Sequence, residues 1–268
     1  MIEEKEDMAM VSLTRGDPFH RKAYFLKPSV PDSSIDYQLE FKLPQCFSSL
    51  PSPFNPKELP LELQFRAWRL EHKDLQTWVD HLAPLHQSTW KKAGIYEAIY
   101  NSTYRIRKQT DLVFALAEKW CTETNTFIFP WGEATITLED VMILGGFSVS
   151  GDSIFSPLED MEEKQMQCEL EEERKGLYDY SAGKKTADTF VWLKRFMNSG
   201  KELEHVAFLV FWLSRYVFHN ARNIVNKAVF SIAIRLATGN RIALAPAVRA
   251  SIYRDLSLLK KNVVASTG

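Results

Sequence analysis

The stretch TFIFPWGEATITLEDVMILGG, residues 126–146, carries the signals for two strands, a turn and a helix in succession. Aromatic and β-branched residues flank residues 130–133, where proline and glycine favour a reversal of the chain, so the pattern predicts a tight β-hairpin. Thr137 is a good helix N-cap, and Asp140, three residues later, completes a pattern like a capping box. The two glycines at the end of the stretch then stop the helix.

Helical periodicity dominates the residues before this unit. Asp74 is a good N-cap for a helix whose apolar residues recur at helical spacing until Pro84, where we expect the helix to end. A helical pair broken at Gly94 and a further helix over 112–120 follow. Alternation of apolar and polar residues over 61–65 predicts one short strand near the start of the folded body.

Proline is concentrated at the N-terminal end of the chain. Seven of the twelve prolines fall within residues 1–58. Such a density forbids long helices, so the sequence predicts a Pro-rich N-terminal arm over 1–58 that is partly ordered by packing on the body. The folded domain is expected over 59–268.

Helices also dominate the C-terminal side. Residues 159–185 read as an acidic insertion that starts with a charge-rich, solvated helix. A run of helices begins near residue 190, and residues 206–217 are apolar nearly all round, which predicts a central helix. Another helix is expected over 224–237, and Pro246 stands as the first residue of the last one. The chain is thus predicted to be mainly α, a compact multi-helix domain with a small β-hairpin.

The composition excludes several classes of protein. With 268 residues and 45% hydrophobic content the chain can bury a sizeable core, and its net charge of -1 lacks the basic excess of a dedicated nucleic-acid binder. The three cysteines lie far apart, so neither a disulfide framework nor a Cys-rich zinc site is expected, and a reducing compartment is predicted. No run of about 18 apolar residues occurs and the first ten residues are acidic, so we expect a soluble intracellular protein with no membrane contact.

Motifs that carry catalysis are missing from the sequence. None of the six histidines has the spacing that places two metal ligands on one helix face. Glu202 and His205 form a single ExxH, where di-metal bundles use two, so a satisfied or surface histidine is the preferred interpretation. There is no dinucleotide or P-loop glycine pattern and no GxSxG, and three unrelated SxxK matches indicate chance. The sequence therefore predicts no catalytic, cofactor-binding or metal-binding residues.

Charge is distributed unevenly along the body. Residues 138–180 hold twelve acidic and three basic residues, whereas residues 190–268 hold twelve basic and three acidic residues, balances of -9 and +9. One interpretation is a basic face offered to a phosphate backbone or an acidic partner. The other, which we favour, is that the two segments neutralise each other or spread over solvated helices. The candidate binding residues of the first interpretation are Arg215, Arg222, Arg235, Arg241, Arg249 and Arg254.

Several ordered strings resemble one known family. They are GEATITLEDVMILGG at 132–146, WLSRYVF at 212–218 and RIALAPAVRASIYRDL at 241–256, with RKAYFLKPS at 21–29 similar to the leader of one branch. Together these strings resemble the plant mobile domain family, often labelled "aminotransferase-like", over roughly residues 20–260. The label implies little chemistry here, because a pyridoxal-phosphate enzyme needs a Schiff-base lysine and a phosphate cup, usually on a large α/β scaffold. We interpret the 132–146 motif as specifying fold rather than catalysis.

The resemblance implies a domain shared by plant transposable elements and host genes descended from them. Host members are nuclear, are linked to silencing of transposable elements, genome stability and meristem maintenance, and some act with, or are fused to, a phosphatase-seven-like protein. The family's domain normally continues past the segment that matches Leu256, which implies a short or incomplete member here.

Three functional hypotheses follow. The first is a non-enzymatic nuclear protein-interaction module, with protein partners that include a phosphatase-seven-like protein. The second is direct DNA or RNA binding through the basic C-terminal half. The third, and least favoured, is a pyridoxal-dependent or other enzyme; no cofactor is expected.

Overall fold

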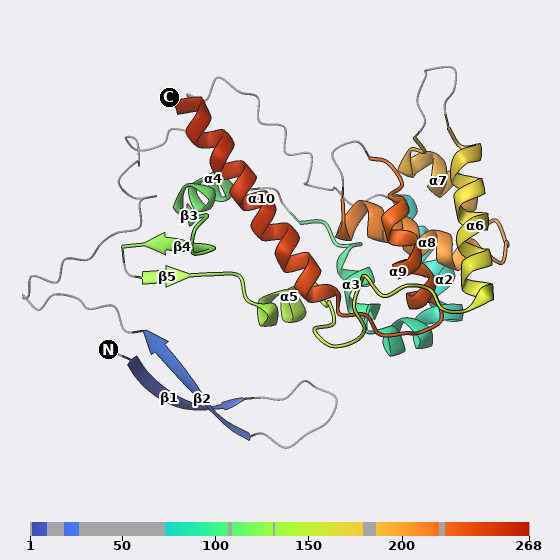
Figure 1. Cartoon of the computed structure of the whole chain (residues 1–268). Helices are drawn as coiled ribbons and strands as arrows, with labels where there is room; N and C mark the ends of the chain where they lie inside the picture. Colours follow the sequence, from blue (N-terminus) through green and yellow to red (C-terminus); the bar gives the residue numbers. More distant parts are fainter. Residues whose placement is uncertain are drawn as a thin grey trace, which may run out of the picture. The chain divides into compact units, whose positions relative to one another are not determined.

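The computed structural model of the chain describes residues 2–9, 19–26, 73–106, 109–130, 132–178, 186–219 and 223–267 (Figure 1). The chain divides into two compact units. The smaller unit comprises Met1–Phe54 and Ala115–Thr135, and the helical unit comprises Asn55–Phe114 and Ile136–Gly268. The predicted strand over 61–65 and most of the predicted N-terminal arm lie outside the described residues.

Helices make up most of the described part of the helical unit. They are α2 (Lys73–Ala93), α3 (Tyr96–Asn101), α5 (Leu138–Gly145), α6 (Met161–Gly176), α7 (Thr189–Phe196), α8 (Glu204–Trp212), the π-helical turn η2 (Leu213–Val217), the 3-10 turn η3 (Lys227–Val229), α9 (Phe230–Ala237) and α10 (Leu244–Thr267). None of the described helices is both long and apolar enough to cross a bilayer.

Strands occur only in the smaller unit among the described residues. Its elements are β1 (Ile2–Ala9), β2 (Phe19–Leu26), β3 (Trp120–Cys121), β4 (Thr126–Phe129) and β5 (Gly132–Ala134), and α4 (Thr110–Lys119) is divided between the two units. β1 and β2 form one antiparallel pair, and β3, β4 and β5 form a second sheet in that order. The predicted fold class, mainly α with a small β component, is confirmed.

The predicted β-hairpin is present as β4 and β5. The two strands pair antiparallel, with Phe127 opposite Ala134 and Phe129 opposite Gly132. The sequence did not predict the third strand, β3, which places Trp120 opposite Phe127. The rings of these two residues lie 4.9 Å apart in an edge-to-face arrangement, which favours the pairing.

The capping box predicted for α5 is confirmed. The Thr137 hydroxyl accepts a hydrogen bond from the backbone N–H of Asp140 at 3.1 Å, and the Asp140 carboxylate accepts one from the backbone N–H of Thr137 at 2.7 Å. These hydrogen bonds lower the pKa of Asp140. Gly146 ends the helix at a φ of 73°, and a Cβ there would lie 2.7 Å from the backbone nitrogen of Ala98. Both ends of α5 are therefore fixed by residues of the 126–146 stretch.

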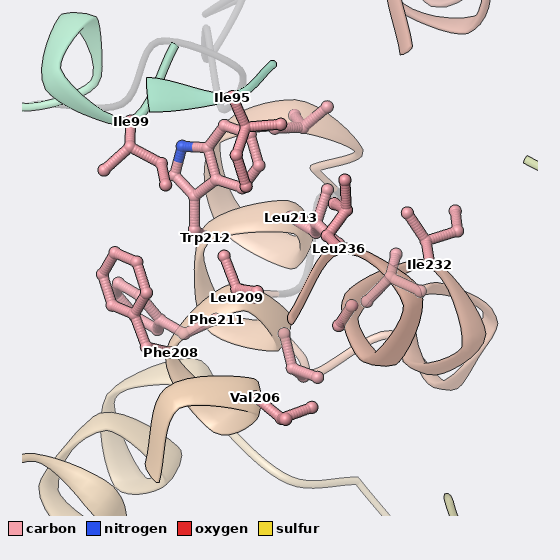
Figure 2. Close-up of a cluster of buried hydrophobic side chains, with 14 of the residues drawn as sticks. Ile95, Ile99, Val206, Phe208, Leu209, Phe211, Trp212, Leu213, Ile232 and Leu236 are labelled. Carbon is pink, nitrogen blue, oxygen red and sulfur yellow. The ribbon is translucent and has the colours of Figure 1, made fainter. Parts of the chain in front are cut away.

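The core of the helical unit is centred on α8. Every residue of α8 is buried, which confirms the predicted central helix. α8 contacts α2, α7 and α9, and Figure 2 shows side chains of α8 gathered with Ile95, Ile99, Ile232 and Leu236 in one apolar cluster. Burying one large apolar side chain stabilises a protein by about 1.5–3 kcal/mol, so the buried apolar side chains of α8 contribute several kcal/mol to the stability of the unit.

The predicted end of α2 at Pro84 is wrong. The helix continues through this proline to Ala93. A proline in a helix interior costs about 3 kcal/mol. Leu82 and Trp90, on either side of it, are both buried in the core, and their burial outweighs that cost. The chain does break at Gly94, which has a φ of 72°.

Three predicted helix starts are shifted. Asp74 lies inside the first turn of α2 and is not its N-cap; its charge there favours the positive end of the helix. The helix expected from Ile224 instead starts at η3, because Ile224 pairs with Asp188 in a β-bridge and the Asn226 side chain caps the turn. Pro246 is the third residue of α10, still within the first turn, where proline loses no helical hydrogen bond.

Candidate interaction surface

Exposed apolar side chains are concentrated between residues 142 and 161, which we call the exposed apolar segment. Of the twelve large apolar side chains that stand exposed among the described residues, six belong to this segment. They are Met142, Ile143, Leu144, Val149, Phe155 and Met161. Leu144 is 77% exposed and Phe155 is 87% exposed, values typical of side chains with no packing partner.

α5 holds the first three of these side chains. Its Val141 is buried, and the helix packs on α3 and α10. The side-chain amide of Asn101 in α3 donates to the carbonyl of Leu144 at 3.3 Å, and the Tyr253 hydroxyl in α10 donates to the carbonyl of Ile136 at 2.7 Å. These bonds and the capping box fix the position of α5. The side chains of Met142, Ile143 and Leu144 are therefore exposed to solvent on a helix that is itself well anchored.

A pocket of about 460 Å³ adjoins the same segment. Its walls include the apolar residues Ile154, Phe155, Val217, Val229 and Ile232 and the polar residues His219, Asn226, Ser251 and Arg254. Asp255 interacts with two of these polar residues: its carboxylate lies 3.0 Å from Nε of Arg254 and 3.8 Å from Nε2 of His219. Apolar walls with a few polar groups suit the apolar side chain of a partner rather than a highly charged ligand.

The structure keeps the two residues of the predicted ExxH apart. Glu202 is exposed, whereas His205 is buried, accepts a hydrogen bond from Nε1 of Trp90 at 2.9 Å and stacks on His86 with the ring centroids 3.7 Å apart. Burial and the neighbouring His86 lower the pKa of His205 to about 3. His205 is therefore a satisfied core histidine, as the preferred interpretation held. Within the described residues, no three His, Cys, Asp or Glu side chains are grouped as ligands for a metal ion.

Sequence reasoning missed the neighbouring Glu204, a buried carboxylate. It accepts hydrogen bonds from Nε1 of Trp78 at 3.1 Å and from the backbone N–H groups of Asn198 and Gly200, both at 2.8 Å. These bonds join α2, the loop after α7 and α8. The role is structural. No motif in the sequence signals it, since the Trp78 donor lies 126 residues earlier and the two nearer donors are backbone N–H groups of a loop.

The six predicted binding arginines fall into different environments. Arg215 and Arg235 are 8% and 4% exposed, so neither presents its charge on an open face. Arg241 and Arg254 are exposed, and Arg249 is half-buried with its guanidinium 5.5 Å from the ring of Tyr253. Arg222 lies outside the described residues. The structure thus does not assemble these residues into one basic surface, although binding itself stays a prediction.

Ion pairs join residues 138–180, the acidic segment, to residues 190–268, the basic segment. Glu173 of α6 lies 3.0 Å from Arg195 and 2.9 Å from Lys201, and these bonds lower the pKa of Glu173. On the same helix Glu171 lies 2.8 Å from Lys227. The buried Arg235 bonds Asp152 at 2.7 Å. Part of the opposite charge is therefore cancelled within the protein, which supports the neutralising interpretation.

The sequence does contain a signal for the exposed apolar segment. Residues 141–144 are four consecutive apolar residues on a helix of only eight. One face of so short a helix cannot bury all four, because successive residues point about 100° apart. The run therefore indicates exposed apolar side chains, but the sequence does not say which face is buried.

Comparisons with known proteins give the chain its relatives. The family model for the plant mobile domain matches residues 94–267. The chain is similar to "Protein MAIN-LIKE 1" of Arabidopsis thaliana, at 33% identity over 107 residues, 36% of this chain and 20% of that protein. It is also similar, in the same organism, to "Serine/threonine-protein phosphatase 7 long form homolog", at 31% identity over 114 residues, 35% of this chain and 8% of that protein.

A shorter match at higher identity points to the same family. "Protein MAINTENANCE OF MERISTEMS" of Arabidopsis thaliana is 41% identical over 63 residues, 24% of this chain and 13% of that protein. The chain therefore covers a fifth or less of the length of these three relatives. No solved structure matches the fold. Because the family model covers well over half of the residues, the chain belongs to the plant mobile domain family.

Proposed function

We propose that the chain is a non-enzymatic protein-interaction module of the nucleus, acting in transposable-element silencing, genome stability or meristem gene regulation. Family membership supports this proposal, as does a relative whose name refers to the maintenance of meristems. The observation that carries the interaction role is the exposed apolar segment, three of whose six side chains stand on the capped helix α5.

Physical chemistry favours a protein partner for this segment. Removal of apolar surface from water drives most protein–protein association, so concentrated exposed apolar side chains mark interaction sites. Ile143 and Leu144, which are consecutive residues of α5, are 65% and 77% exposed. The neighbouring pocket supplies a recess for one apolar side chain of the partner.

A phosphatase-seven-like protein is the partner that we propose. A phosphatase 7 long form homolog contains a segment similar to this chain, so the two kinds of domain coexist in one polypeptide. Where the two domains are on separate chains, we expect them to bind each other through the surfaces that they use within one polypeptide. The exposed apolar segment is the surface through which this chain would bind.

The proposal is tested by capturing partners with matched variants. The chain is expressed with a tag in plant cells, where its location is imaged and nuclear complexes are identified by mass spectrometry. In a second measurement the purified chain is titrated directly with purified phosphatase-seven-like protein. We expect Ile143→Ser together with Leu144→Ser to weaken capture by about 10- to 100-fold, since each lost apolar contact is worth about 1.5 kcal/mol or more. Leu85→Ser, at a 67% exposed position outside the segment, is the control.

Two results would contradict the proposal. Capture that is equal for the wild type, the double variant and the control would remove the exposed apolar segment from the interface. Exclusion of the chain from the nucleus would remove the nuclear role. The pyridoxal-dependent alternative is tested separately: added pyridoxal phosphate should produce no protein-bound absorbance at about 400 nm.

A further inference from the structure

Arg215 is a buried cation in an unusual setting. It lies in η2, where the helix that begins as α8 widens into a π-helical turn, a geometry that often marks functional sites. The residue is 8% exposed, and its guanidinium carbon lies 4.4 Å from the ring centroid of Phe190 and 5.7 Å from that of Tyr216. Within the part of the chain that the structure describes, its Nε and Nη1 atoms have no hydrogen-bond partner.

Among the described residues, such an arrangement leaves the positive charge of Arg215 without a counter-ion. A guanidinium cannot lose its proton in a protein, so it stays charged when buried. Aromatic rings offset part of the lost hydration through cation–π contact, but they accept no conventional hydrogen bonds. Buried charges are normally paired and hydrogen-bonded.

Arg235 shows how this protein treats a second buried arginine. That residue is 4% exposed, and its guanidinium bonds the Asp152 carboxylate at 2.7 Å and the Ser153 carbonyl at 3.0 Å. Arg215 has the same burial without those partners. The difference indicates that the partner of Arg215 comes from outside the described residues.

Two more buried polar atoms lack a partner among the described residues, and one of them belongs to the residue before Phe190, whose ring contacts Arg215. The Thr189 hydroxyl, next in sequence to Phe190, is buried without a partner among the described residues, and so is Oδ1 of Asn223. The backbone of these two residues is joined, because Thr189 N–H donates to the Asn223 carbonyl at 2.9 Å. The neighbouring carboxylate of Asp188 is already used, since it caps α7 by accepting from the N–H groups of Phe190 and Val191.

We propose that Arg215 is the centre of a binding site for a small oxyanion, a phosphate or carboxylate group that enters from solvent. The guanidinium supplies the charge and directed N–H donors, and the Thr189 hydroxyl supplies a further donor. The aromatic rings hold the guanidinium plane in place. Because so little of Arg215 is exposed, the site accepts one anionic group and not an extended polyanion.

The experiment compares anions on the full chain at constant ionic strength. The melting temperature is followed while sodium chloride is replaced by phosphate in one series and by acetate in another, which separates the two oxyanions. We expect a saturable rise in melting temperature for the wild type with at least one of them. Arg215→Met, which keeps the length of the side chain and removes the charge, should weaken the apparent affinity at least tenfold.

Two further variants keep the test decisive. Arg249→Met removes an arginine that also lies against an aromatic ring, Tyr253, and should leave the anion effect unchanged. If Arg215→Met does not fold, Thr189→Val replaces one donor at nearly constant volume and should weaken anion binding several-fold. Parallel anion curves for the wild type and the Arg215 or Thr189 variant would overturn the proposal, and so would a wild type that responds to phosphate and acetate no more than to chloride.

Discussion

His205 is the residue through which acid acts on the stability of the helical unit. Burial and His86 lower its pKa to about 3 in the folded protein, against 6.5 for an ordinary histidine. Between those values the unfolded chain binds more protons, so the free energy of unfolding falls as the pH falls. From pH 7 to pH 5 the expected loss is about 2 kcal/mol. The pKa of His86 is also lowered by burial and acts in the same direction.

Urea unfolding at several pH values between 7 and 5 measures this effect. His205→Gln keeps a side-chain acceptor for the Trp90 indole but cannot titrate, so we expect it to lose most of the pH dependence. His81→Gln, at an exposed position, should retain it. The carboxylates of Asp140 and Glu173, whose pKa values are lowered, titrate below this range and do not obscure the result. Equal slopes for wild type and His205→Gln would contradict the assignment.

Single residues also show where the sequence stops being informative. Thr137 and Asp140 were predictable as a capping box because the two partners are three residues apart. Arg235 bonds Asp152, which lies 83 residues earlier, and no local pattern encodes such a pairing. The arginines of the basic segment therefore look alike in the sequence, although the fold buries Arg215 and Arg235 and leaves Arg241 exposed.

Among the elements, α2 carries a proline that its own sequence does not favour. Pro84 is exposed in the middle of the helix, where it removes one backbone hydrogen bond and crowds the preceding turn. Pro84→Ala should restore the bond. We expect the free energy of unfolding to rise by about 1–3 kcal/mol. A few tenths of a kcal/mol are lost from this gain, because alanine gives the unfolded chain more conformational entropy than proline does.

Chemical denaturation of Pro84→Ala beside Ser88→Ala measures this gain. Ser88 is exposed in the same helix, and its replacement should change stability by no more than about 0.5 kcal/mol. An unchanged or lower stability of Pro84→Ala would mean that a bend at this proline is needed to bury both Leu82 and Trp90. Far-UV circular dichroism of both variants shows whether the helix content is retained.

Elements were predictable where local signals and tertiary packing agree. The hairpin of β4 and β5 and the all-round apolar α8 follow directly from turn residues and periodicity. The predicted helix over α2 ended too early, because the local signal of Pro84 for a helix end opposes the packing of the residues that follow it. In the structure the packing prevails and the helix continues. The start of α9 was misplaced because a β-bridge between Asp188 and Ile224 holds the chain extended, and that contact joins distant residues.

At the scale of the whole molecule, the separation of charge along the sequence is partly undone by folding. Glu171 and Glu173 of the acidic segment engage Lys227, Arg195 and Lys201 of the basic segment. Cations held in this way are less available to a phosphate backbone, because each must leave its carboxylate before it binds. Direct nucleic-acid binding by these residues would therefore compete with the protein's own acidic helix, α6.

Fluorescence anisotropy with labelled duplex DNA between about 50 and 200 mM salt tests this competition. We expect the wild type to bind more weakly than about 1 μM even at low salt, whereas Glu171→Gln with Glu173→Gln should bind several-fold tighter with a steeper salt dependence, because three cations are released. Glu162→Gln with Glu172→Gln makes the same change in net charge at exposed positions of α6 outside these ion pairs, and should have a smaller effect. Submicromolar, steeply salt-dependent binding by the wild type that Arg241→Glu weakens would instead assign the basic segment to nucleic acid.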